Sequence, residues 1–190
     1  MKDKYDVIVL GAGIVGLSVY FHTALPFKLV FSGLGELFIG LDFGILLTVG
    51  AFYVQTGFFA LEPLVASLPI ALLVAAILYI NEFQDYKADK KVGKNHLVVR
   101  MGRKRAQVGY GIMMWMTYFI IIAGVVAGII SPWAILGLVT IPIAMKAVNT
   151  AKVHYDDYLK LAPANVGTIM SHLLTGLLMT LGYMIDKWIS

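Results

Sequence analysis

Long stretches of this chain contain no charged residue, and this feature restricts its possible folds more than any other. Six segments lack Asp, Glu, Lys and Arg, namely 7–27, 37–41, 43–61, 63–81, 106–145 and 161–185. A helix that crosses a lipid bilayer needs about 20 predominantly apolar residues. Segment 106–145 is therefore long enough for two such helices, with a turn expected near Ser131 and Pro132. The pattern predicts an all-α, polytopic transmembrane helix bundle.

Five transmembrane helices are predicted, at about 37–56, 63–80, 107–130, 133–149 and 167–186, and 7–25 is a sixth candidate. The composition agrees, because 59% of the residues are hydrophobic and 14% are charged. Soluble domains have roughly 45–50% apolar and about 25% charged residues. The chain has no cysteine, which excludes disulfides, thiolate metal sites and cysteine nucleophiles.

The basic residues are unevenly distributed along the chain. If all six segments cross the membrane, the connections 26–36, 81–106 and 146–166 lie on one side and carry 12 of the 15 Lys and Arg residues. Basic loops face the cytoplasm in membrane proteins. We therefore expect an inner or plasma membrane protein whose polar loops are cytoplasmic. The net charge of +4 follows from this topology, and no nucleic-acid partner is expected.

The segment KYDVIVLGAGIVGLS (4–18) resembles the leader of flavin oxidoreductases, because it contains G-x-G-x-x-G at Gly11, Gly13 and Gly16. A dinucleotide-binding fold also needs further strands and an acidic residue about 20 residues after the glycines. The first acidic residue after them is Glu36, and predicted membrane helices follow it. We therefore interpret the segment as a transmembrane helix whose small residues allow close packing, and we expect no FAD.

The longest polar segment, 81–106, directly continues the predicted helix 63–80. Asn81, Asp85 and Asp89 have i, i+4, i+8 spacing and would share one face of that helix. Carboxylates are suitable ligands for Mg²⁺, which completes its coordination shell with substrate phosphates, and Lys or Arg can neutralise the remaining charge. The pattern favours a ligand with a diphosphate head and a hydrocarbon tail. The alternative is an ordinary solvated loop.

The sequence NEFQDYKADKKVGKNHLVVRMG (81–102) resembles the second aspartate-rich motif of the UbiA superfamily of intramembrane prenyltransferases. That motif is N-(D/E)-x-x-D-x-x-x-D followed by G-K-x-(T)-L-x-V-R-x-G. The matching residues are Asn81, Glu82, Asp85, Asp89, Gly93, Lys94, Leu97, Val99, Arg100 and Gly102. His96 stands where the family often has Thr. Segments 24–57 and 161–178 are similar to 1,4-dihydroxy-2-naphthoate prenyltransferases, so the resemblance covers about 20–190.

The resemblance implies nine spans around a cavity that is open to lipid, with Mg²⁺ between two aspartate-rich motifs and the substrate diphosphate. It implies transfer of a polyprenyl group from polyprenyl diphosphate to a dihydroxynaphthoate-like aromatic acceptor in quinone biosynthesis. The implied metal ligands are Asp85 and Asp89, supported by Asn81. The implied diphosphate contacts are Lys94 and Arg100, with Lys90 and Lys91 as further candidates.

The family's first aspartate-rich motif has no counterpart here, because Asp156 and Asp157 differ from it in spacing and place. We expect residues 1–190 to form one prenyltransferase-like domain without the family's first helices, which a second chain would then supply. Two other functions remain open. One is a non-catalytic membrane protein that binds isoprenoid lipid or a partner subunit, and the other is prenyl transfer to a glycerol-phosphate lipid or another quinone precursor.

Asp42 and His172 lie inside predicted spans, where ionisable residues are functional candidates. Asp42 either lines the cavity, or snorkels or stays protonated. His172 either reaches the oxygens of the acceptor or, as the better interpretation, bonds to a neighbouring helix. His22, His96 and His154 have no metal-ligand spacing.

Overall fold

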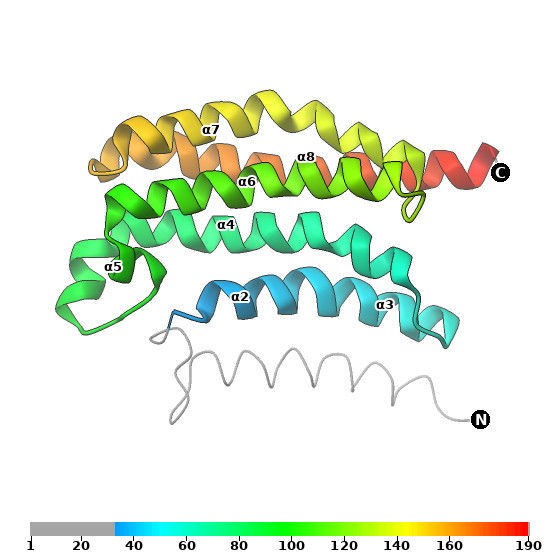
Figure 1. The fold of residues 1–190 in the computed structure, drawn as a ribbon, viewed down its shortest axis with the longest axis horizontal. Coiled ribbons are helices and arrows are strands. Elements are labelled where there is room, and N and C mark those ends of the chain that lie inside the picture. Colours follow the sequence, from blue (N-terminus) through cyan, green and yellow to red (C-terminus); the bar gives the residue numbers. More distant parts are fainter. Residues whose placement is uncertain (1–32, 190) are drawn as a thin grey trace.

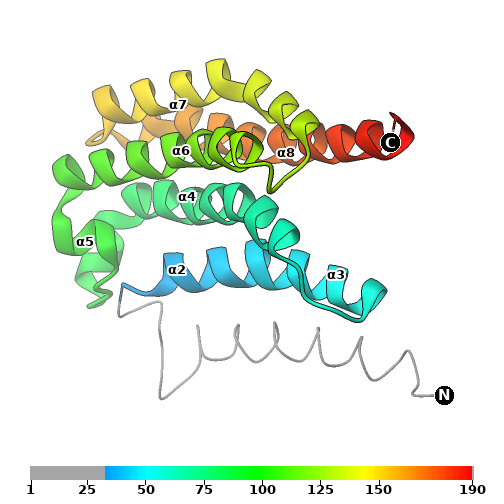
Figure 2. The ribbon, with the colours of Figure 1, turned by 45° about the vertical axis from the view of Figure 1, so that its right-hand side comes forward.

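The structure is a computed structural model that describes residues 33–189. This part of the chain forms helices joined by short connections and contains no β-strand, which confirms the all-α fold class. Five helical segments are long and apolar enough to cross a membrane. They lie side by side as a bundle, with the segment nearest the N-terminus at one edge and α7 at the opposite edge (Figures 1 and 2).

The first of these segments, Gly35–Thr56, is called the first span below. It consists of α2 (Gly35–Gly40), the π-helix η2 (Leu41–Leu46) and α3 (Leu47–Thr56). It is followed by α4 (Leu61–Lys91), the short α5 (Leu97–Met101) and α6 (Arg103–Val126). The 3₁₀-helix η3 (Pro132–Thr140) continues into α7 (Ile141–His154), and α8 (Tyr158–Ile189) ends the described chain.

Each of the five predicted spans overlaps one of these five segments, and the sixth, at 7–25, lies outside the described residues. The turn expected near Ser131 and Pro132 is also confirmed. The Ser131 hydroxyl accepts a hydrogen bond from the backbone N–H of Trp133 at 3.2 Å, and Pro132 begins η3. A serine cap followed by proline is a common start of a helix, because proline has no N–H that needs a partner there.

The buried core lies where α4, α6 and α8 meet, and it includes hydroxyl groups that bond between helices. The hydroxyls of Tyr110 and Thr168 are 2.7 Å apart. The Thr140 hydroxyl lies 2.9 Å from that of Tyr118 and 2.7 Å from that of Thr175. Such bonds satisfy polar groups that neither lipid nor apolar side chains can satisfy. The core therefore ties the long helices together laterally.

Two glycines allow especially close helix contacts. A β-carbon on Gly44 would overlap the backbone of Ala71, where η2 crosses α4. A β-carbon on Gly182 would overlap the Trp133 carbonyl, where α8 meets η3. Small residues at such crossings bring helix backbones together and increase van der Waals contact in lipid.

Candidate functional site

The polar end of α4 and the turn after it form the centre of the candidate site. The helix does not stop at the apolar boundary near residue 80 but continues to Lys91, as the sequence predicts. Gly93 then adopts a left-handed conformation with φ of +77°, which glycine tolerates best. The turn brings the Lys94 backbone N–H to 3.0 Å from the Asp89 carbonyl oxygen. The chain thus folds back over the end of α4.

Asp89 is held by two basic side chains. Its carboxylate lies 2.7 Å from Lys94 Nζ through Oδ1 and 3.2 Å from His96 Nε2 through Oδ2. The other ring nitrogen of His96, Nδ1, lies 3.0 Å from Glu82 Oε2. Asp89 is 8% exposed and His96 is 2% exposed. His96 therefore bridges two buried carboxylates.

The charge of His96 follows from these neighbours. Burial by itself lowers the pKa of His96, because it disfavours the charged ring. The bond to Glu82 and the negative charges of Glu82, Asp89 and Glu36 oppose this effect, and the net result is a pKa above the ordinary value of 6.5. The two acids therefore favour the protonated form of the ring.

Glu36 connects this cluster to the first span. It is 3% exposed, and its Oε1 accepts a hydrogen bond from the Leu97 backbone N–H at 3.3 Å. Its other oxygen, Oε2, has no hydrogen-bond partner in residues 33–189. Glu36, Glu82 and His96 each place one ligand atom within 4.8 Å of the others, an arrangement that can hold a metal ion. A mixed nitrogen and oxygen set of this kind suits transition metals better than Mg²⁺, which prefers oxygen.

Asp85 and Asn81 have more open surroundings. Asp85 is exposed and forms no ion pair or hydrogen bond within the described part of the chain. Asn81 is exposed too, and its side-chain oxygen accepts a short hydrogen bond from Asn165 of α8. Asn81, Asp85 and Asp89 lie on one uninterrupted helix, as their spacing predicts. The carboxylate of Asp85 is thus available to a ligand, whereas that of Asp89 is already oriented.

The four predicted diphosphate contacts differ in their surroundings. Lys94 is paired with Asp89, as described above. Arg100 is exposed, and its Nε donates to the Asn95 carbonyl at 2.8 Å. The Lys90 ammonium lies 5.7 Å from the centre of the Tyr86 ring. Lys91 is exposed and has no ion-pair partner among residues 33–189. All four lie at the end of the bundle where α4 ends.

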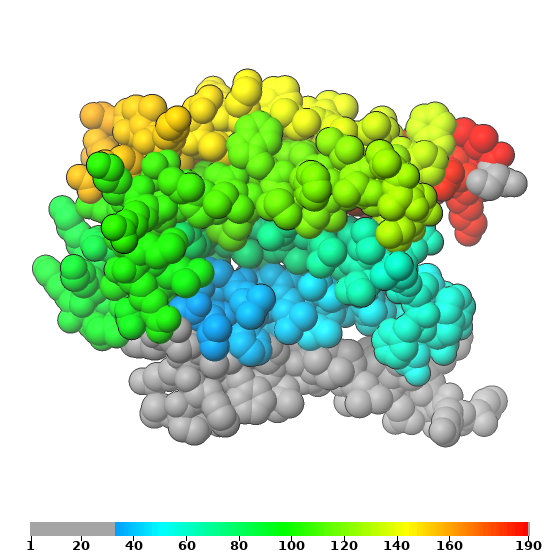
Figure 3. All heavy atoms as spheres, viewed as in Figure 1, coloured from blue at the N-terminus to red at the C-terminus, as the bar shows by residue number. Residues whose placement is uncertain are grey.

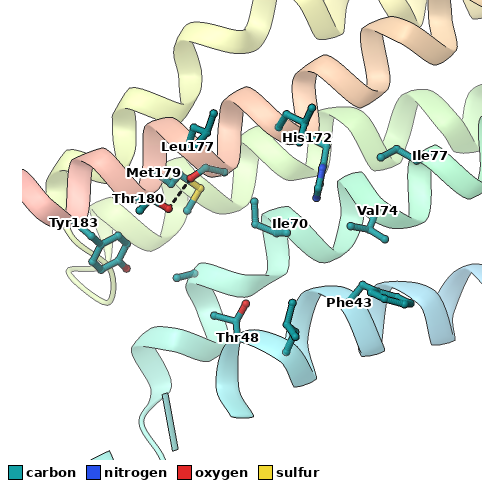
Figure 4. A pocket seen from close by; sticks show the side chains of 14 residues that line it. Phe43, Thr48, Ile70, Val74, Ile77, His172, Leu177, Met179, Thr180 and Tyr183 are labelled. Atoms are coloured by element: carbon teal, nitrogen blue, oxygen red, sulfur yellow. Dashed lines mark hydrogen bonds between the residues drawn. The ribbon is translucent and has the colours of Figure 1, made fainter. Parts of the chain in front are cut away.

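An apolar groove of about 770 Å³ opens between the first span, α4 and α8 (Figure 4). On α4, its lining includes Ile70, Val74 and Ile77, which occupy one helix face. Steps of four residues from Ile77 lead to Asn81 and then to Asp85, so the same face becomes polar at the end of α4. The groove therefore leads toward the polar site.

His172 of α8 points into this groove (Figure 4). It forms no hydrogen bond with any described residue, so helices within 33–189 provide no partner for the bond that the sequence favours. Asp42 is 1% exposed, and its Oδ1 has no partner within 33–189. Its neighbour Phe43 lines the groove but Asp42 does not.

Sequence comparison places the chain in a known family. Residues 5–182 match the UbiA prenyltransferase family. The chain belongs to this family. The match begins before Gly11, Gly13 and Gly16, so it includes the stretch that resembles a flavin-enzyme leader. The resemblance seen over about 20–190 therefore extends further toward the N-terminus.

Relatives of this UbiA-family chain include enzymes named for naphthoate prenylation. The 1,4-dihydroxy-2-naphthoate octaprenyltransferase of Bacillus subtilis is 29% identical over 92% of this chain and 56% of the relative. The Escherichia coli protein of the same name is 26% identical over 99% of this chain and 60% of the relative. The 2-carboxy-1,4-naphthoquinone phytyltransferase of Synechocystis is 26% identical over 90% and 56%. The chain thus spans little more than half the length of these relatives.

Four residues near the site were not assigned a role from the sequence: Glu36, Glu82, His96 and Asn165. Glu82 occupies the second position of the aspartate-rich motif, and Glu36 and Asn165 lie in the other two segments that resemble the family. Their position in segments that resemble the family was the only sequence feature that pointed to a role for these three residues. His96 has no ligand spacing along the sequence, and only the turn at Gly93 brings its ring against Glu82 and Asp89.

Proposed function

We propose that this UbiA-family chain takes part in transfer of a polyprenyl group from polyprenyl diphosphate to an aromatic acceptor in quinone biosynthesis. The observation that carries the proposal is the continuity between the apolar groove and the polar residues Asn81 and Asp85 on one face of α4. A ligand with a hydrocarbon tail and a diphosphate head matches both parts. The names of the relatives support a dihydroxynaphthoate-like acceptor.

The two halves of the donor would be bound by different forces. The groove lining is almost entirely apolar, so the prenyl tail would leave the lipid and be held there by van der Waals packing. Lys94 and Arg100 supply positive charge for the diphosphate, and Lys90 and Lys91 add to it. Arginine and lysine form short, charge-assisted bonds with phosphate oxygens. The polar end would therefore orient the donor, and the groove would select for its tail.

The residues also fit Mg²⁺. Asp85 offers an exposed carboxylate without a partner in the described chain, one helical turn from Asp89. Lys94 and His96 contact different oxygens of Asp89, and each carboxylate oxygen has a second lone pair available. We assign Asp85 and Asp89 as the ligands, with Asn81 in support. When bound, Mg²⁺ would neutralise charge on the leaving diphosphate. Lys94 and His96 would keep the Asp89 carboxylate oriented.

The proposed location is the inner membrane, with the Asp85 end of the bundle facing the cytoplasm. The five apolar segments support a multi-pass membrane protein, and the excess of Lys and Arg at this end supports the orientation. Soluble Mg²⁺ and phosphate compounds are available on that side. We treat residues 1–190 as a single prenyltransferase-like domain.

A binding assay on membranes that contain the chain tests this proposal. We expect Mg²⁺-dependent binding of a labelled polyprenyl diphosphate, with affinity lowered about 100-fold in the Asp85→Asn/Asp89→Asn variant. The matched control is Asp156→Asn/Asp157→Asn, which removes two carboxylates from the α7–α8 connection. Asp156 pairs with Arg103 and Asp157 pairs with Lys160, and neither carboxylate forms an ion pair or hydrogen bond with Asp85 or Asp89. Equal losses in both double variants, or none in either, would contradict the assignment.

Adding 1,4-dihydroxy-2-naphthoate to the same membranes separates transfer from binding. Prenylated product that disappears in the Asp85→Asn/Asp89→Asn variant would support the enzymatic role. Binding that depends on both aspartates, without any product, would favour the non-catalytic, isoprenoid-binding alternative.

A further inference from the structure

A second groove, of about 530 Å³, lies on the outside of the bundle where α6 and α7 meet. Its apolar walls include Ile112, Trp115 and Phe119 of α6 and Val148 of α7. A β-carbon on Gly111 would lie 3.6 Å from Val148 Cγ1, so the two helices are in close contact at the floor. Figure 3 shows the face on which α6 and α7 lie side by side. This groove shares no lining residue with the groove between the first span, α4 and α8.

Basic residues surround one end of this outer groove. Lys152 of α7 is part of its lining. A neighbouring hollow is lined by Lys104, Arg105, Gln107 and Val108, and the last two residues also line the groove. The two depressions are therefore adjacent. The start of α6 and the end of α7 place this basic end at the same end of the bundle as α5 (Figure 1).

These cations lack counter-ions within the described structure. Arg103, just before them, forms an ion pair with Asp156 and lies 5.0 Å from the centre of the Tyr86 ring. By contrast, Lys104, Arg105 and Lys152 form no ion pair with any residue in 33–189. An apolar channel that ends in three unneutralised cations is complementary to one chemical class. That class has a hydrocarbon chain and a phosphate group at its end.

We propose that the outer groove binds an anionic phospholipid of the surrounding membrane. One acyl chain lies along Ile112, Trp115 and Phe119, and the headgroup phosphate is bound by Lys104, Arg105 and Lys152. Clusters of basic residues at the edge of a membrane-embedded surface favour anionic over zwitterionic lipids. The prenyl diphosphate proposed above belongs to the other groove, so neither proposal depends on the other.

The tryptophan in this groove provides a direct test. The chain has three tryptophans, at 115, 133 and 188, and only Trp115 lines the groove. With Trp133→Phe and Trp188→Phe in place, fluorescence reports on Trp115 alone. The protein is placed in phosphatidylcholine vesicles that contain either brominated phosphatidylglycerol or brominated phosphatidylcholine as quencher. We expect brominated phosphatidylglycerol to quench Trp115 at about 100-fold lower mole fraction, since each cation contributes about fivefold.

We expect the preference for phosphatidylglycerol over phosphatidylcholine to be lost in the variant Lys104→Gln/Arg105→Gln/Lys152→Gln. The matched control, Lys87→Gln/Lys146→Gln/Lys160→Gln, removes the same charge from residues that line neither depression, and it should keep the preference. Equal quenching of the parent protein by both brominated lipids would overturn the proposal without any variant. The same conclusion would follow if both triple variants lost the preference to the same extent.

Discussion

Replacement of His96 by leucine is expected to lower the free energy of unfolding by about 3–5 kcal/mol. The His96 ring lies 3.0 Å from a Glu82 oxygen and 3.2 Å from an Asp89 oxygen, and all three side chains are buried. Removal of the ring would leave Glu82 without its partner, with Glu36 beside it, while Asp89 would keep Lys94. Buried charges without a partner are among the most destabilising changes in proteins.

Unfolding of purified protein in mixed micelles with increasing dodecyl sulfate, followed by tryptophan fluorescence, measures this effect. The control is His154→Leu at the end of α7. That side chain is partly buried and forms no hydrogen bond or ion pair with a described residue. A His96→Leu midpoint equal to that of His154→Leu would show that the bridge contributes nothing to stability.

A second variant distinguishes loss of charge balance from loss of packing. His96→Leu/Glu82→Leu removes both partners of the buried pair, and apolar replacement of a complete pair is often neutral. We therefore expect the double variant to be more stable than His96→Leu. If it were less stable, the packing of the histidine ring, rather than its charge, would explain the loss.

Replacement of Gly44 by alanine is expected to lower the free energy of unfolding by about 1–3 kcal/mol, the usual cost of overpacking. The added methyl group would overlap the backbone of Ala71 and push η2 away from α4. The same substitution at Gly50, in the same span, meets no atom within 4 Å. Alanine is a better helix former than glycine, so Gly50→Ala should stabilise the protein by up to about 1 kcal/mol.

Because Gly44→Ala should lower the stability and Gly50→Ala should raise it, the two variants together test the contact between η2 and α4. Both variants would be compared with the parent protein in the same dodecyl sulfate titration. Lower midpoints for both would indicate that glycine is needed for backbone flexibility along the whole span. Higher midpoints for both would mean that η2 and α4 are not in close contact.

The sequence predicts the five described spans well because bilayer thickness limits both the length and the charge of a crossing helix. It predicts their ends less well. The predicted helix 167–186 begins at Tyr158 in the structure, and 107–130 ends at Val126. Hydropathy indicates where contact with lipid ends. A helix ends where its backbone hydrogen bonds end, and this point can lie in water beyond the apolar segment or inside that segment. The polar extension of α4 was predictable only because Asn81, Asp85 and Asp89 have helical spacing.

The surroundings of these residues were less predictable. Asn165 bonds to Asn81 from 84 positions away, and Glu36 accepts the N–H of Leu97 from 61 positions away. Periodicity describes one helix face at a time and contains no information on which faces meet. The resemblance to the UbiA family identified the segments that carry Glu36 and Asn165, but the contacts themselves appear only when the helices are packed.

The π-helix η2 fixes how the two ends of the first span are rotated relative to each other. A π-helix accommodates one more residue than an α-helix would over the same length. Because each residue turns an α-helix by about 100°, that residue sets the rotational phase of α2 relative to α3. Glu36 faces the buried charges on one side of η2, while Leu47 and Thr48 face the groove on the other. Deleting a single residue from η2 would rotate one of these faces out of place, so η2 determines how the buried charged cluster is oriented relative to the apolar groove.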